Sequence, residues 1–134
     1  MVAERPQESE RESFVTIALW IVNIIAALVF FAAGLMKAAR SKEKVVVSGM
    51  GWAETVPAAG VTAIGLIEVI GALGLILPIA TGIAPYLAPI AAVGLAIVMV
   101  GAIVVHVRRK ESAASAVVLL LLSVVSAVLG FLVV

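Results

Sequence analysis

The amino-acid sequence predicts an all-α integral membrane protein with four transmembrane helices, and three observations support this fold class. Of the 134 residues, 64% are hydrophobic and only 13% are charged, and the mean hydropathy is +1.29. A soluble domain of this size cannot cover its core with so little polar surface. Four stretches are long and apolar enough to cross a hydrocarbon core about 30 Å thick as helices. Finally, nearly all the charged residues lie before or between these stretches.

The composition also excludes several function classes. The net charge of +1 provides no basic field that would hold a nucleic acid. The absence of cysteine excludes disulfides, thiolate metal sites and iron–sulfur clusters. His106 is the only histidine, so a multi-histidine metal site cannot form within one chain. We therefore expect no metal site and no intrinsic cofactor.

The first two predicted helices cover residues 14–36 and 58–77. The first contains no charge and follows an acidic tail, residues 1–13, with four Glu and two Arg. This tail is unlike the basic start of a cleavable signal peptide. The second helix begins directly after Pro57, and proline suits the start of a helix.

The third and fourth predicted helices cover residues 86–105 and 113–134. The charged segment 106–112 separates them. In the longer first connection, residues 45–56 are too short to span a membrane. This segment is predicted either to lie along the interface as an amphipathic piece or to form an ordinary loop held by Trp52.

The distribution of Lys and Arg predicts the orientation, because cytoplasmic loops carry an excess of both. The tail contributes only Arg5 and Arg11. Seven basic residues lie in the two connections that share the other side: Lys37, Arg40, Lys42, Lys44, Arg108, Arg109 and Lys110. We therefore expect connections 37–57 and 106–112 in the cytoplasm and both termini outside, with the bundle integral to a bacterial cytoplasmic membrane.

Glu68 is the only charged residue inside a predicted span. A charge at this depth costs about 2.5 to 3.5 kcal/mol, which favours the neutral carboxyl. Because of this cost, Glu68 is a candidate functional residue. Gly65, Gly71 and Ala72 lie three or four residues away. Small residues let another helix approach, so Glu68 is predicted to face the interior of the bundle.

Three interpretations of Glu68 stay open, one of which is a contact with a partner protein. It serves as a proton relay, a hydrogen-bonding partner of a quinone, or a cation site. Alternatively, it is structural and bonds to a polar residue on a neighbouring span, where the candidates are Asn23, Ser123 and Ser126. Asn23 itself is expected to hold helices together, and both serines are expected to bond back to carbonyls of their own helix.

Lys37, Glu54 and His106 are predicted to lie near the cytoplasmic ends of the spans. Such a cluster suits the binding of an anionic headgroup or the delivery of protons toward Glu68. The alternative is that Lys37 extends to the interface and His106 is solvated. Lys37 and His106 each lie about 15 Å from the centre of their span at helical rise, so neither is expected to contact Glu68 directly.

Several segments resemble the DoxX-like family of small membrane proteins. Residues 30–37 (FFAAGLMK) carry a Gly-x-x-Lys signature, and residues 65–78 (GLIEVIGALGLILP) are similar to the second-span motif of that family. Residues 94–102 and 106–111 resemble its third span and the basic end of that span, and Trp52 and Pro85 lie where the family has them. The resemblance covers about residues 20–112. Many family members carry an Arg near the start of the first span, whereas this sequence has no Arg inside that span.

The resemblance implies a four-helix up-and-down bundle linked to membrane redox systems, among which is the small subunit of thiosulfate:quinone oxidoreductase. It also implies that Lys37, Glu68 and His106 are the functional positions. Asn23, a polar residue inside the first predicted span, is a fourth candidate. The leading hypothesis is an accessory subunit that binds a quinone or lipid-like molecule and works with another membrane or redox subunit or in a homo-oligomer. The alternatives are a structural or assembly subunit of a larger complex and a small proton-coupled transporter that uses Glu68.

Overall fold

The structure is a computed structural model that describes residues 5–134, and all its regular elements over that range are helices. Two short helices, α2 (Lys42–Val47) and the 3-10 helix η1 (Gly51–Thr55), lie in the first connection. Four helices are long and apolar enough to cross a membrane: α1 (Pro6–Ala39), α3 (Ala58–Thr81), α4 (Leu87–Arg108) and α5 (Ala114–Val133). The predicted four-span helical membrane bundle is confirmed.

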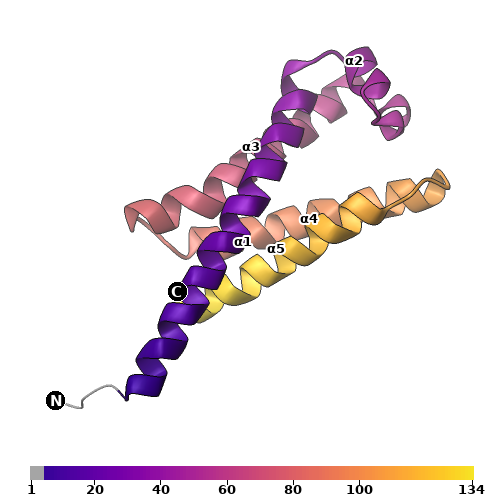
Figure 1. Cartoon of the computed structure of the whole chain (residues 1–134). Coiled ribbons are helices and arrows are strands. Elements are labelled where there is room, and N and C mark those ends of the chain that lie inside the picture. Colours follow the sequence, from indigo (N-terminus) through magenta and orange to yellow (C-terminus); the bar gives the residue numbers. More distant parts are fainter. Residues whose placement is uncertain (1–4) are drawn as a thin grey trace.

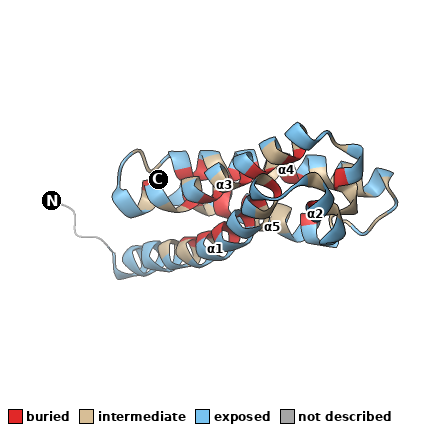
Figure 2. Cartoon of the chain, turned by 90° about the horizontal axis from the view of Figure 1, so that it is seen from above, coloured by how far each residue is buried: buried red, intermediate tan, exposed pale blue. Residues whose placement is uncertain are grey.

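The helix boundaries differ from the predicted spans mainly at the start of α1 and the end of α3. Because α1 begins at Pro6, residues 6–13 of the predicted tail form its first turns, which are exposed (Figure 2) and extend past the other helices (Figure 1). At 34 residues, α1 is about 51 Å long, well beyond the thickness of a hydrocarbon core. The α3 helix continues through Pro78 to Thr81 and ends at Gly82, whose φ of +70° is a left-handed helix cap.

The four long helices form an up-and-down bundle in which each packs on the next and α5 packs back on α1 (Figure 1). Contacts of Asn23 with Leu75 and of Lys37 with Glu68 show that α1 and α3 run antiparallel. The most extensive packing occurs within the pairs α1–α3 and α4–α5. In Figure 1 the two pairs meet near the C-terminus and diverge toward α2 and the α4–α5 connection.

The burial pattern is that of a membrane bundle rather than of a soluble one. Large apolar side chains cover the outside, as shown by Leu28, Ile70 and Ile97, which are 67–68% exposed. Small residues occupy much of the interior, and Phe30 is the largest fully buried side chain. The buried positions follow the inward faces of the helices (Figure 2). Lipid would therefore cover the exposed apolar surface.

The two basic connections lie at the same end of the bundle, as the charge distribution predicts. Arg109 Nη2 in the α4–α5 connection lies 3.8 Å from Glu54 Oε2 in η1. The segment 45–56 forms part of α2 and η1, and Val45 and Ala53 are completely buried beside Val61 of α3. It is helical and packed over this end rather than an ordinary loop, and its position along the membrane interface stays a prediction. The assignment of this end to the cytoplasm stays a prediction.

Candidate functional site

Lys37 of α1 and Glu68 of α3 form a buried ion pair. Lys37 Nζ donates to Glu68 Oε1 at 2.7 Å and to Oε2 at 2.8 Å, and the two side chains are 9% and 1% exposed. Each charge compensates the other. Either charge alone would carry a large desolvation cost inside the bundle. The inward orientation of Glu68 is confirmed. The predicted polar partners for it, Asn23, Ser123 and Ser126, are wrong.

The prediction that Lys37 does not contact Glu68 is also wrong. Side chains on a helix lean toward its N-terminus, so the long Lys37 side chain extends back into the bundle rather than outward to the interface. In addition, α3 crosses α1 only one turn before Lys37, at Gly34. The distance from Lys37 to the centre of its own span therefore says little about its distance to Glu68.

Two glycines allow this close crossing of α1 and α3. A Cβ built on Gly34 would lie 2.6 Å from the carbonyl oxygen of Gly65, and one built on Gly65 would lie 2.6 Å from the carbonyl oxygen of Gly34. No real Cβ atom tolerates such a contact with backbone. Gly34 precedes Lys37 by three residues, and Gly65 precedes Glu68 by three. Two Gly-x-x-charge motifs thus face each other, and the contact between their glycines brings the two charges together.

The ion pair lies in the wall of a cavity of about 610 Å³. Side chains from all four long helices and from the α2–η1 segment line it, and most are apolar, among them Ala33, Val98 and Met99. The volume lies within the range of small-molecule sites, about 300–1,000 Å³. The cavity therefore combines ligand size, an apolar wall and one charged pair.

Trp52 of η1 lines the same cavity and contacts the ion pair. Lys37 Nζ lies 5.5 Å from the centroid of the Trp52 ring, which is cation–π distance. An ammonium group has three N–H donors, and Glu68 accepts two of them. The remaining donor is available to an acceptor oxygen inside the cavity. The Trp52 contact has no signal in the sequence, because fourteen intervening residues, most of them in α2 and turns, separate Trp52 from Lys37.

His106 of α4 lines the cavity but does not pair with Glu68. Its Nδ1 lies 3.4 Å from Glu111 Oε2, and Glu111 also accepts a hydrogen bond from Arg109 Nε. That bond from Arg109, reinforced by the charge of Arg109 and by His106, holds the pKa of Glu111 below its ordinary value. Because Arg109 also approaches Glu54, this network joins the α4–α5 connection to η1.

Asn23 lies in a different polar layer, nearer the other end of the bundle. Its Nδ2 donates to the carbonyl oxygen of Leu75 at 2.8 Å, and its Oδ1 accepts from Ser126 Oγ at 2.6 Å. This contact across α1, α3 and α5 agrees with the predicted role of holding helices together. Ser123 bonds back to the carbonyl oxygen of Leu119 at 2.8 Å, as expected, whereas the same prediction for Ser126 is wrong.

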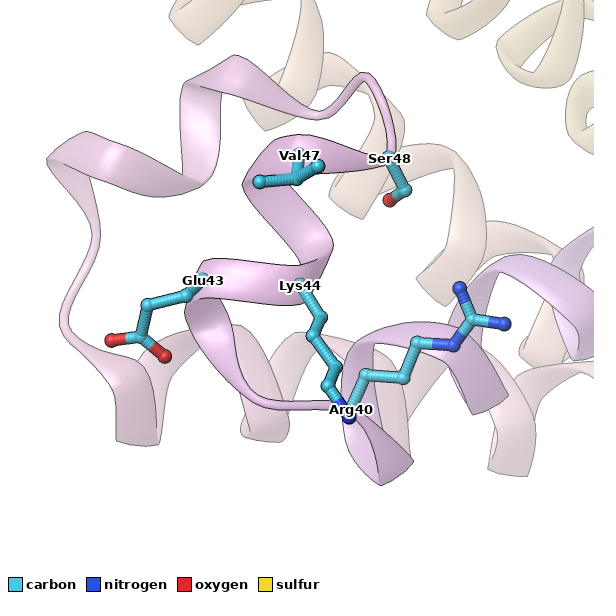
Figure 3. A pocket seen from close by; sticks show the side chains of 5 residues that line it. All are labelled: Arg40, Glu43, Lys44, Val47 and Ser48. Carbon is cyan, nitrogen blue, oxygen red and sulfur yellow. The ribbon is translucent and has the colours of Figure 1, made fainter.

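A second hollow of about 580 Å³ lies on the surface between the end of α1 and α2. Its lining is shown in Figure 3 and consists of Arg40, Glu43, Lys44, Val47 and Ser48. The carboxylate of Glu43 points away from the guanidinium of Arg40 in that view. This hollow is an open part of the basic end and shares no residue with the cavity. Over residues 5–134 no group of three or more His, Asp or Glu side chains is arranged to hold a metal ion.

Comparison with known proteins identifies a family. The sequence matches the DoxX-like family over residues 21–128, which includes most of the four spanning helices and the positions Asn23, Lys37, Glu68 and His106. No curated protein and no solved structure matches the chain.

Proposed function

The chain belongs to the DoxX-like family, and from this premise we propose that it is a small integral membrane subunit that binds a quinone or lipid-like molecule in the Lys37–Glu68 cavity and works with a membrane redox partner. The observation that carries the proposal is the cavity itself. It has the volume of a ligand site, a mainly apolar wall from four helices and a single buried ion pair. Such a combination suits an amphiphile with an apolar body and an oxygen-bearing head.

The residues in the wall have separate tasks in this proposal. The third N–H of Lys37 donates to an acceptor oxygen of the ligand, and Trp52 packs beside it. Glu68 orients the Lys37 ammonium through both carboxylate oxygens and is the group that holds or releases a proton there. A bound quinone would supply the electron-accepting group, and a partner protein would supply the other redox centre.

Mass spectrometry of the protein purified in a mild detergent tests this function. We expect ubiquinone or menaquinone, and a redox protein, to co-purify with the wild type. K37M and E68Q should each lower the bound quinone, because the first removes the donor and the second removes the ionised partner that orients it. N23A is the matched control, since Asn23 is equally buried but lies outside the cavity. If the protein retains native lipid but carries neither quinone nor a partner protein, the proposal is contradicted.

A structural role in a larger complex is the second candidate. Among the described residues, every buried side-chain nitrogen or oxygen has a hydrogen-bond partner, so the ion pair is complete without a ligand. If this candidate holds, the double variant K37M/E68L should retain partner assembly and any activity of the complex. Loss of activity with normal assembly favours ligand binding instead.

The small proton-coupled transporter is less well supported. A transported cation would need the carboxylate of Glu68, and Lys37 already occupies both of its oxygens. Proton-driven uptake or efflux in proteoliposomes that E68Q abolishes would favour transport over the two other functions.

A further inference from the structure

The wall of the Lys37–Glu68 cavity reaches the outer surface of the bundle within the membrane spans. Val29 of α1 lines the cavity and is also 42% exposed. Gly101 of α4 lines it and is exposed as well, and a Cβ added there would meet no atom within 4 Å. Both residues lie inside the predicted spans, where an exposed position faces hydrocarbon. The cavity therefore meets the bilayer at its side.

The other end of the bundle is closed. Ser126 Oγ bonds to Asn23 Oδ1 at 2.6 Å and ties α5 to α1, and a Cβ on Gly130 of α5 would lie 2.9 Å from Pro89 of α4. At the opposite end, Trp52 packs over the ion pair. The two exposed span residues that line the cavity, Val29 and Gly101, thus lie on the side of the Asn23–Ser126 contact where Lys37 and Glu68 are found.

The charges in the cavity wall are balanced. Glu68 compensates Lys37 within the wall, and Glu111 lies beside His106 just outside it. The remaining lining is mainly apolar. No unpaired positive charge is left to attract an anionic head, whereas the third N–H of Lys37 is available to a neutral acceptor.

We infer that the cavity takes a neutral, lipid-soluble ligand that enters sideways from the bilayer past Val29 and Gly101. This inference rests on the proposed binding role of the cavity and specifies the class of ligand and its route. Such a ligand is already concentrated in the bilayer, so the route does not require passage through water. Its polar head contacts Lys37, and its apolar part extends toward the exposed wall.

A photoreactive probe tests the route directly. The protein is placed in nanodiscs with a single-chain alcohol that carries a diazirine on its alkyl chain, and labelled residues are mapped by mass spectrometry. Met99, which lines the cavity and is 4% exposed, reports entry. We expect labelling of Met99 in the wild type and a severalfold loss in the double variant V29W/G101W, because α1 and α4 are not packed neighbours and one substitution narrows the cavity on one side only. L28W is the control, because Leu28 neighbours Val29 but faces outward and does not line the cavity.

Three results would overturn the inference. The first is an unlabelled Met99 in a sample where outward-facing Leu28 is labelled. The second is full labelling in V29W/G101W with a loss in S115W, because Ser115 lies in the wall near the start of α5, at the water-facing end. The third is equal labelling of Met99 by a matched probe with a phosphate head. Excess ubiquinone should displace the neutral probe; if it does not, quinone binding fails while sideways entry of a neutral ligand still stands.

Discussion

The bundle contains two buried polar layers that resemble each other in burial but differ in chemistry and surroundings. In one, Asn23 bonds to Leu75 and Ser126 with no charge involved. In the other, Lys37 and Glu68 form an ion pair and line a cavity of about 610 Å³. A neutral, fully bonded and closed layer needs no function beyond holding helices together. A charged layer inside a membrane span is costly, and its position beside a cavity of ligand size favours a ligand-binding role.

The largest expected effect comes from removing one charge of the ion pair. K37M or E68L alone should destabilise the fold by about 3–5 kcal/mol, because the other charge stays buried without a partner. The double variant K37M/E68L should recover much of this loss. Reversible unfolding in mixed micelles measures all three, and a double variant as unstable as the sum of the singles would contradict direct pairing.

The next largest effect concerns the close crossing of α1 and α3 at Gly34 and Gly65, which brings Lys37 and Glu68 together. G34A or G65A should cost about 1–3 kcal/mol, since the added Cβ would lie 2.6 Å from backbone of the other helix. Bound quinone should fall as well, because separating α1 from α3 weakens the ion pair. G94A is the matched control: nothing lies within 4 Å of a Cβ there, so its stability should be unchanged or higher. Equal effects of G34A and G94A would show that the crossing is not tight.

Substitutions in the neutral Asn23 layer should destabilise the fold less than those in the Lys37–Glu68 layer. N23A removes the bonds to Leu75 and Ser126 and should cost about 0.6–1.7 kcal/mol, the range of polar contacts between membrane helices. It should leave bound quinone unchanged. S123A, which removes only a bond to its own helix, should be close to neutral. Unfolding in mixed micelles and the amount of bound quinone measure both effects. A loss of bound quinone in N23A would show that the two layers are not independent.

The smallest effect is a pH dependence at the basic end. The hydrogen bond from Arg109 lowers the pKa of Glu111 in the folded protein from its ordinary value of 4.5. The stabilising contribution is therefore complete above 4.5 and is lost as the pH falls through the lowered pKa. Thermal unfolding of wild type and E111Q along an acid series measures it. The difference between the two should shrink as the solution becomes acidic; a constant difference would rule out a contribution from ionised Glu111.

The sequence alone determined the fold class, the four spans and the inward position of Glu68. These follow from hydropathy over some twenty residues and from small residues on one helix face, which are local properties. The partner of Glu68 depended on where α1 and α3 cross, and no local pattern fixes a crossing point. The two Gly-x-x-charge motifs did carry a signal, since a glycine three residues before a charge on each helix is compatible with such a crossing.

Tertiary structure alone decided that Lys37 turns inward, that Ser126 bonds to Asn23 rather than to its own helix, and that Trp52 covers the ion pair. Each of these contacts joins residues that are distant in sequence. Hydropathy reflects the free energy of transferring each segment from water to lipid, and it therefore predicts which segments enter the membrane. It does not record which side chains meet once they are there, and in this protein the meeting of Lys37 with Glu68 beside a cavity defines the candidate site.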